Sequence, residues 1–483
     1  MGHRNHETFE VVLMADCKLT LHSRAVGGSV DPLRLLGVLA AQRGDIAVLH
    51  SGNDGNAVLA VNAISGVRLT ADEGKITLHR TGLAARAQVP EDIAMMPSAA
   101  WQCWQNIITE ISFSQPPPDR VGWLGWLSYE AGVMAELPQL YGQSSADIAL
   151  AHWQIFESYF VLDAATRQWF LVALHPDFAE AEKIMEQMQR QFSAANTCDV
   201  PKYAPVPATG VQHPDGAAFK AAVRRCKEYI AGGDIYQANI SAVWTARVAE
   251  PGSQVFCRLV KNNPAQYAAF FRYGDDEIIS ASPELFLQRA GQLLETRPIK
   301  GTRPRVCGNP VADQQRCDEL LHSEKDRSEL AMIVDLLRND LSRVCTSVSV
   351  EKARQIEKLP TLWHTHGVVT GKLHPHVGKR WDKIITAMCP GGSITGVPKI
   401  RAMEIIRELE NQPRGIYCGN IGWISPAGDG MLNIAIRTIH IVNGIAKFRS
   451  GAGITADSNA DEEYAEILAK ASAPLRALTE EIL

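Results

Sequence analysis

The chain has 483 residues, of which 46% are hydrophobic and 21% are charged, and its formal net charge is −5. This composition is typical of a globular protein with two or three domains, and the acidic balance argues against a general nucleic-acid binder. No run of 18 apolar residues predicts a membrane span, the polar start does not resemble a signal peptide, and the ten scattered cysteines indicate a reduced, cytoplasmic protein.

Residues 9–195 are predicted to form one N-terminal region. Apolar periodicity and turn residues divide it into separate elements. We expect strands at 9–14 and 45–51, a turn at 52–55, a helix at 32–42, a strand packed on a helix within 122–132, a hairpin at 156–174 turning near 163–166, and an exposed helix at 177–195.

Residues 196–213 contain three prolines and little periodicity, so we place a linker there. The second region, 214–475, opens with a predicted helix that begins at Pro214 and Asp215 and ends before Gly232. A strand is predicted at 234–241. Helical and strand patterns then alternate irregularly, which indicates a mixed α/β or α+β domain.

Lys300 lies where a predicted apolar strand meets a turn, between Pro298, which restricts the backbone, and Gly301, which allows left-handed geometry. A lone lysine is more often a solvated surface charge. Glu284, however, lies sixteen residues earlier within another apolar strand. If the two strands form a hairpin, amine and carboxyl face one site, and burial favours Glu284 as a general acid. The alternative for Glu284 is a solvated strand end.

Two predicted helices carry acidic side chains on one face. Asp326 and Glu329 are three residues apart on a helix at 323–341, beside its apolar stripe. Glu463 and Glu466 are likewise spaced on a helix at 462–478, with Lys470 on the same face. Together the two helices could hold Mg²⁺, which binds one or two carboxylates and keeps several waters. The alternative is a pair of salt-bridged surfaces.

Glycine-rich turns suggest a site for an anion. Residues 390–399 open a helix, and the backbone N–H groups of such a turn can bind negative charge. Residues 450–454 are predicted to form a second such loop. Arg437, on a predicted strand at 432–441, could bind a carboxylate, and His364 could be an acid or base, although a lone histidine is more often structural. A small polyanionic substrate fits this set.

Eight motifs, in this order, resemble those of the chorismate-utilising enzymes. They are Gly-Asp-Ile-Tyr-Gln (233–237), Ala-Ser-Pro-Glu (281–284), Pro-Ile-Lys-Gly-Thr (298–302), Lys-Asp-Arg-Ser-Glu (325–329), Gly-Gly-Ser-Ile-Thr-Gly-Val-Pro-Lys (391–399), Cys-Gly-Asn-Ile-Gly (418–422), Ile-Arg-Thr (436–438) and Gly-Ala-Gly-Ile-Thr-Ala-Asp-Ser (451–458). The resemblance implies an α+β sandwich of the anthranilate synthase component I type, with large antiparallel sheets flanked by helices and two intertwined subdomains.

The resemblance also implies roles for the matching residues. Lys300 would be the nucleophile that adds to the chorismate ring, Glu284 the acid that protonates the departing 4-hydroxyl, and His364 an active-site histidine. The implied magnesium ligands are Glu329 and Glu466, with Glu463 and Asp326 binding through water. The implied substrate-binding positions are Gly301, Thr302, Tyr417, Arg437, Gly451, Ala452 and Gly453. Ser51 is a candidate for binding tryptophan, as in some relatives.

Two positions favour one branch of the family. Gln237 stands where the water-using isochorismate branch has a lysine, and Lys300 stands where anthranilate synthases have alanine. Lysine at the second position resembles the aminodeoxychorismate synthases, which lead to 4-aminobenzoate and folate. His366 departs from the family, because apolar residues are common at its position.

Nothing in the sequence resembles a glutamine-hydrolysing domain or a lyase domain. We therefore expect ammonia from a separate glutamine amidotransferase subunit (component II) or from free ammonium, and release of aminodeoxychorismate as the product. The alternatives are an anthranilate synthase component I and a non-catalytic sensor of chorismate or tryptophan. Because no implied catalytic group is missing, the sensor is the weaker alternative.

Overall fold

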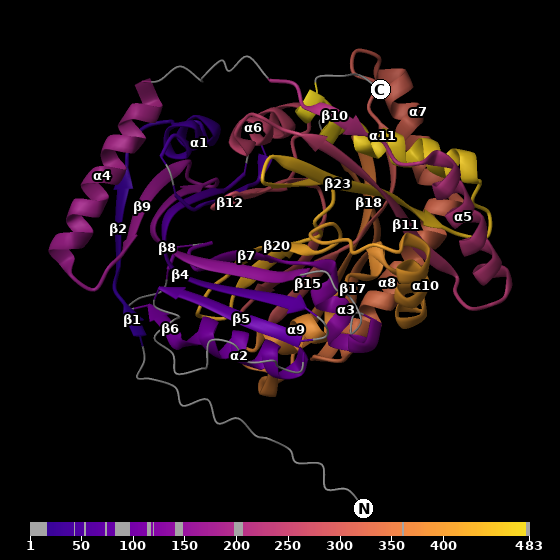
Figure 1. Cartoon of the computed structure of the whole chain (residues 1–483), viewed down its shortest axis with the longest axis horizontal. Helices are drawn as coiled ribbons and strands as arrows, with labels where there is room; N and C mark the ends of the chain where they lie inside the picture. The colour runs from indigo at the N-terminus through magenta and orange to yellow at the C-terminus, as the bar shows by residue number, and fades with distance from the viewer. Residues whose placement is uncertain are drawn as a thin grey trace, which may run out of the picture.

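The computed structural model describes residues 17–42, 44–52, 55–72, 75–82, 97–113, 117–118, 120–140, 148–197, 206–359 and 362–479 (Figure 1). The predicted strand at 9–14, part of the turn at 52–55 and the middle of the linker lie outside these residues. The region boundaries stay a prediction. Among the described helices, none has the length and apolar character needed to cross a membrane.

The described strands form one large antiparallel sheet and one small parallel pair. The pair joins β1 (Cys17–Leu19) to β6 (Ile111–Phe113). Two long strands, β4 (Ala57–Asp72) and β8 (Ile148–Asp163), connect the halves of the large sheet. Their pairing is irregular between Ala63 and Ser65, next to Asn62 with φ 63°, so the strands bend there. The bend lets one sheet continue from one layer into the other.

The first layer contains the strands that pair outward from one end of β4 and β8. They are β3 (Ile46–His50), β12 (Tyr267–Tyr273), β13 (Asp276–Ser282), β22 (Thr438–Val442), β23 (Ile445–Ile454), β11 (Gln237–Arg247), β10 (Thr209–Gln212), β19 (Gly396–Val397), β9 (Gln168–Leu174) and β2 (Leu21–Val26). Strands from both halves of the chain therefore interleave.

The second layer continues from the other end of β4 and β8. Its strands are β5 (Lys75–Gly82), β7 (Trp123–Leu127), β20 (Asn420–Ile424), β21 (Gly430–Asn433), β14 (Leu285–Ala290), β15 (Leu293–Arg297), β18 (Leu362–Leu373), β16 (Ile299–Pro304) and β17 (Cys345–Lys358). The hairpin of β14 and β15 brings the stretch after Ser282 next to the stretch before Lys300, as predicted.

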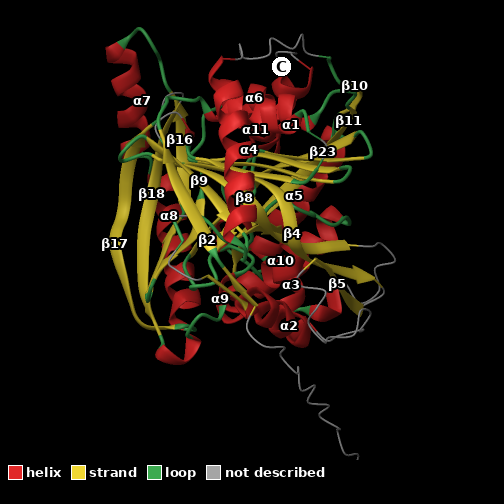
Figure 2. Ribbon diagram, turned by 90° about the vertical axis from the view of Figure 1, so that its left-hand side faces the viewer, coloured by secondary structure: helices red, strands yellow, loops and turns green. Residues whose placement is uncertain are grey.

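Helices cover the outer faces of both layers (Figures 1 and 2). Those packed in the apolar core of the first layer are α1 (Pro32–Ala40), α4 (Phe178–Thr197), α5 (Gly216–Ala231), α6 (Gly252–Asn262), α10 (Lys399–Glu410) and α11 (Ala460–Thr479). Those in the core of the second layer are α2 (Pro97–Glu110), α3 (Tyr129–Glu136), α8 (Glu324–Ser342) and α9 (Trp381–Met388). Helix α7 (Pro310–His322) precedes α8. The α+β class with large antiparallel sheets and flanking helices is confirmed.

Most predicted elements are present. The helices at 32–42, 214–231, 323–341 and 462–478 correspond to α1, α5, α8 and α11, and the hairpin at 156–174 corresponds to β8 and β9. The predicted strand at 234–241 begins later, at Gln237. The helix at 177–195 is amphipathic rather than simply exposed, because α4 buries Met185, Met188 and Phe192.

The predictions about local structure at residues 450–454 and at Arg437 are wrong. Residues 450–454 do not form a loop but end strand β23, where they pair with β11 from Ala238 to Ala242. Arg437 is not within a strand, because β21 ends at Asn433 and β22 begins at Thr438. Arg437 has φ 51°, a left-handed conformation that interrupts the strand. In both places long-range pairing decided the structure, which a local pattern does not report.

A buried ion network joins β11 to β23 beside the glycines at 451–453. Glu410 binds Arg414 at 2.7 Å and Arg449 at 2.8 Å, and its side chain is 1% exposed. Arg414 also donates to the Asn239 carbonyl at 2.6 Å, and Arg449 donates to the Ser241 hydroxyl at 3.0 Å. Each buried charge thus has an opposite charge and further hydrogen bonds, as burial requires.

We expect Glu410→Leu to lower the free energy of unfolding by about 3–5 kcal/mol, because two buried guanidinium groups lose their counter-charge. Denaturant unfolding measures this change. Glu408→Leu is the control, since Glu408 lies on the same helix at an exposed position. Equal stability of the two variants would contradict a structural role for the network.

Candidate active site

Lys300 is held by strand β16 in the second layer. Gly301 has φ 79°, and a Cβ atom there would lie 2.8 Å from the Asp326 Cγ, so both conformation and space require glycine. The register with β18 shifts between Ile299 and Thr302, and the Thr365 hydroxyl donates to the Lys300 carbonyl. The strand therefore continues past Lys300, and a bulge takes the place of the predicted turn.

The Lys300 side chain is 11% exposed, and its Nζ lies 3.9 Å from the Glu329 Oε2. Burial lowers the pKa of Lys300, and so does Lys470, while Glu329, Glu284 and Glu466 raise it. The net shift is downward, because the desolvation of an ammonium group is the largest of these effects. Burial thus favours the neutral amine.

Glu284 lies between β13 and β14 and is 5% exposed. The Ser393 hydroxyl donates to its Oε1 at 2.7 Å. Burial raises the pKa of Glu284, while Ser393, Lys300 and His364 oppose that shift. Glu284 thus lies between two strands and not, as predicted, within one, because β13 ends at Ser282. It interacts electrostatically with Lys300, and the glycine-rich turn at 390–399 supplies a hydroxyl to it through Ser393.

The two acidic helices meet near Lys300. Lys325 on α8 lies 3.8 Å from the Glu463 Oε1 on α11, and Lys300 interacts electrostatically with both Glu329 and Glu466. Glu463 is 3% exposed and accepts a hydrogen bond from the Ser458 hydroxyl at 2.7 Å. Burial raises the pKa of Glu463, as does the neighbouring charge of Glu466.

Lysines balance these carboxylates. Lys470 donates to Glu466 at 2.5 Å and to the Gly451 carbonyl at 3.1 Å. Burial raises the pKa of Glu466, but Lys470, Lys325 and Lys300 together lower it below its usual value. Hard oxygen ligands on two facing helices suit a hard cation such as Mg²⁺. Asp326, the other predicted ligand on α8, forms an ion pair with Arg303 at 3.1 Å.

Glycines at 451 and 453 in β23 let polar side chains approach the strand closely. A Cβ on Gly451 would lie 2.6 Å from the Asn239 Oδ1 and 2.9 Å from the Tyr417 hydroxyl. A Cβ on Gly453 would lie 2.8 Å from the Gln237 Nε2 and 3.4 Å from the Lys300 Nζ. Ala452 between them faces the core. The two glycines thus bring the backbone of β23 close to these polar groups and to the Lys300 amine.

Sequence reasoning did not assign binding roles to several polar groups beside these glycines. Among the described residues, both amide atoms of Gln237, the Asn239 Oδ1 and the Ser450 hydroxyl are buried without a hydrogen-bond partner. Buried polar atoms normally have partners, so these groups point to a polar ligand. The only sequence signal was their proximity to the motifs at 233–237 and 451–458.

Three further residues are predicted to bind the substrate: Tyr417, Thr302 and Arg437. Tyr417 is buried beside Gly451, and burial raises the pKa of its hydroxyl. Thr302 pairs with His364 across β16 and β18. The Arg437 Nη1 donates to the Asn263 Oδ1 at 3.2 Å, and burial lowers the pKa of its guanidinium. A substrate contact for Arg437 stays a prediction.

His364 is 3% exposed, and its Nε2 lies 3.0 Å from the Glu357 Oε2. His364 also interacts electrostatically with Glu284, the proposed acid. Ser51 lies in the first layer and accepts a hydrogen bond from Arg120 at 2.9 Å. Its proposed role in binding tryptophan has no support in these contacts.

Residues 68–476 match the family described as chorismate binding enzyme. The aminodeoxychorismate synthase component 1 of Bacillus subtilis is 36% identical over 391 residues, which cover 79% of this chain and 82% of that protein. An anthranilate synthase component 1 of Haloarcula marismortui is 36% identical over 382 residues, covering 75% and 77%. The crystal structure of anthranilate synthase component I from Streptococcus pneumoniae aligns over 94% of this chain and 99% of that chain, with a TM-score of 0.73 and 27% identity.

Proposed function

Because the chain belongs to the family of chorismate binding enzymes, we propose that it is an aminodeoxychorismate synthase component 1, which replaces the 4-hydroxyl of chorismate by an amino group. The observation that carries this proposal is the buried Lys300 amine, with its lowered pKa, which interacts electrostatically with the buried Glu284. A buried amine next to an acid is suited to covalent catalysis.

The reaction proceeds in two displacements. The neutral Lys300 amine forms a C–N bond to the ring while Glu284 protonates the 4-hydroxyl, which leaves as water. Ammonia then forms a second C–N bond as the bond to Lys300 breaks. The Glu284 carboxylate takes the proton lost by the incoming nitrogen, so both groups return to their starting states. Protonation converts a poor leaving group into a good one, and the covalent step divides one difficult substitution into two.

Mg²⁺ is the proposed cofactor, because hard carboxylate oxygens suit it, but no three of the described carboxylates of α8 and α11 have oxygens within 4.8 Å of one another. Glu329 and Glu466 would bind it directly, and Glu463 and Asp326 would act through water. Bound there, the ion supplies positive charge for a carboxylate of the substrate. Ammonia would come from a glutamine amidotransferase partner, since the relatives named above are component 1 proteins.

The competing function is anthranilate synthase, because a relative of that name is 36% identical to this chain, the same identity as the aminodeoxychorismate synthase relative. Lys300 favours the amination at C4, since the resemblance places alanine there in anthranilate synthases. The test incubates the protein with chorismate, Mg²⁺ and ammonium at alkaline pH and then adds an aminodeoxychorismate lyase. The proposal expects 4-aminobenzoate, and it is abandoned if anthranilate or isochorismate is the main product.

Ser393→Ala is expected to shift the pH profile of amination toward higher pH. The Ser393 hydroxyl stabilises the ionised form of Glu284, so its loss raises the pKa of that carboxyl further. The limb of the profile set by Glu284 should move to higher pH, and neither limb should move to lower pH. Rates are measured at a constant concentration of neutral ammonia, with Ser472→Ala, at a half-buried position on α11, as the control.

Glu466→Gln is expected to raise the Mg²⁺ concentration needed for half-maximal activity at least roughly tenfold, because a charged ligand becomes neutral. Titration of activity with Mg²⁺ after removal of metal with a chelator measures the effect. Glu462→Gln, at an exposed position on the same helix, should leave the titration unchanged. Identical curves for both variants would remove Glu466 from the proposed site.

A further inference from the structure

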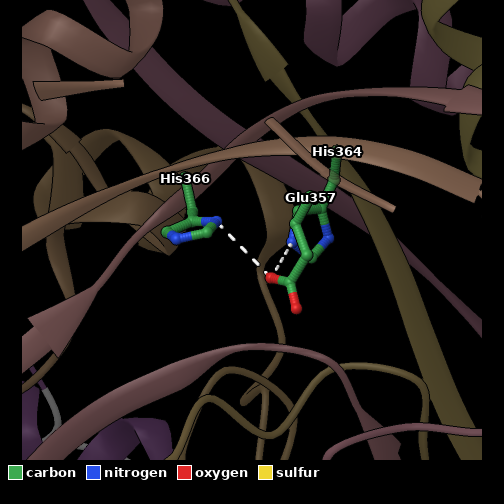
Figure 3. Close-up of side chains that lie close together, drawn as sticks. All are labelled: Glu357, His364 and His366. Atoms are coloured by element: carbon green, nitrogen blue, oxygen red, sulfur yellow. Dashed lines mark hydrogen bonds and ion pairs between the residues drawn. The ribbon is translucent and has the colours of Figure 1, made fainter. Parts of the chain in front are cut away.

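A second set of ligands lies on strands β17 and β18, where Glu357 faces His364 and His366 (Figure 3). Glu357 pairs directly with His364 in the antiparallel register, and His366 follows two residues later on the same face of β18. Both imidazole rings approach the same carboxylate oxygen (Figure 3). This is the one group of three or more His, Cys, Asp or Glu in the described part of the chain with ligand atoms within 4.8 Å of one another.

The distances between the three ligands suit a transition metal. The His364 Nε2 lies 3.0 Å and the His366 Nδ1 lies 3.6 Å from the Glu357 Oε2. Zinc binds imidazole nitrogen and carboxylate oxygen at about 2.0–2.2 Å, so neighbouring ligands of a tetrahedral site are roughly 3.3 Å apart. The two observed distances bracket that value. All three ligand atoms lie within 4.8 Å of one another, so side-chain rotations could bring them around one ion.

The His366 Nδ1 provides an independent indication of a ligand. His366 is 8% exposed, and its Nδ1 is buried without a hydrogen-bond partner among the described residues. The separation of 3.6 Å from Glu357 is too long for a hydrogen bond. An orphaned ring nitrogen directed at a carboxylate is costly unless another group binds it. A cation held between them would satisfy it.

The ligand types select the metal. Two imidazoles and one carboxylate suit Zn²⁺, Co²⁺ or Ni²⁺, whereas Mg²⁺ prefers oxygen ligands alone. The site therefore differs in chemistry from the carboxylates of α8 and α11. Three protein ligands leave a fourth position open, and the Glu357 side chain is 34% exposed, which gives an ion access from solvent.

We propose that Glu357, His364 and His366 bind Zn²⁺ and that this binding inhibits the enzyme. The metal would bind the His364 Nε2, and His364 is one of the groups that act electrostatically on Glu284, the proposed acid. His364 can then neither accept nor donate a proton at that atom. The inhibition rests on the proposed function, but metal binding does not, so the two are tested separately.

Binding is measured without substrate, by titrating the metal-free protein with Co²⁺ in excess Mg²⁺ and then displacing the Co²⁺ with Zn²⁺. We expect one site with the visible absorption of a four- or five-coordinate Co²⁺ bound by nitrogen and oxygen. His366→Val and Glu357→Gln should each weaken Co²⁺ and Zn²⁺ binding at least roughly tenfold. Glu357→Gln preserves side-chain shape, and melting temperatures verify that both variants are folded.

The matched control is His376→Val, because His374 and His376 are a second pair of histidines two residues apart with adjacent rings, at a more exposed position. That variant should bind Co²⁺ like the unchanged protein. Unaltered affinity in His366→Val and Glu357→Gln, absorption characteristic of cysteine ligands, or the absence of binding would each overturn the proposal. In the activity assay, low concentrations of Zn²⁺ should inhibit the unchanged protein and His376→Val at least tenfold more strongly than His366→Val. Equal inhibition of all three would overturn the proposed inhibition.

Discussion

Replacing Lys300 by methionine is expected to reduce amination of chorismate at C4 by at least roughly 10³-fold. Methionine fills a similar volume but has no lone pair of comparable nucleophilicity, and it leaves Glu284, Glu329 and Glu466 in place. Removal of a buried amine also lowers the positive charge next to Glu329, 3.9 Å away, so Mg²⁺ is kept saturating. Product formation is measured with the coupled lyase.

A covalent readout separates a nucleophile from a purely electrostatic lysine. With chorismate but no ammonia, the unchanged protein should gain the mass of chorismate minus water after rapid acid quenching, and Lys300→Met should not. Lys372→Met is the control, because Lys372 lies on β18 at an exposed position. Undiminished amination by Lys300→Met would return Lys300 to the role of a buried charge, and anthranilate from this variant would indicate diversion to the chemistry of the alanine-bearing relatives.

Glu284→Gln is expected to lower the rate of amination roughly 10²–10⁴-fold, the usual contribution of a general acid. Glutamine keeps the size of the side chain and can still accept the Ser393 hydrogen bond, but it cannot protonate the leaving hydroxyl. The loss should appear mainly in kcat, since the acid acts in the transition state. Steady-state kinetics at saturating Mg²⁺ and ammonia measure it.

Glu277→Gln is the matched control for the acid. Glu277, on β13, is also partly buried, and burial raises its pKa. It accepts a hydrogen bond at 2.8 Å from the N–H of Gly252, the first residue of α6. It should change kcat little. If Glu284→Gln also retained full kcat, another group would have to protonate the 4-hydroxyl.

The two predictions share one physical basis. The active state needs a neutral Lys300 and a protonated Glu284, although their ordinary pKa values of 10.5 and 4.5 favour the opposite distribution of the proton. Burial lowers the pKa of Lys300 and raises the pKa of Glu284, so the difference between the two pKa values becomes smaller. Each pKa unit by which this difference falls increases the population with neutral Lys300 and protonated Glu284 about tenfold. Desolvation is thus the means by which this site prepares both groups.

Local sequence patterns determined the helices and many of the strands. Helix α8 is an example, because its cap at Ser323 and its apolar stripe from Leu330 to Leu341 depend on residues only three or four positions apart. The motifs also predicted that the segment after Glu284 pairs with the segment before Lys300, and the hairpin of β14 and β15 joins these two segments because they are close in sequence. Family membership followed from the same motifs and was confirmed by the matches.

The tertiary structure alone decided what depends on distant segments. The glycines at 451–453 belong to β23 because β11, more than 200 residues earlier, pairs with them. Contact between α8 and α11, the orphaned amide of Gln237 and the approach of His366 to Glu357 likewise depend on packing and register. A sequence specifies these distances only through the whole folded chain, because strand pairing and desolvation are set by neighbours that are remote in sequence.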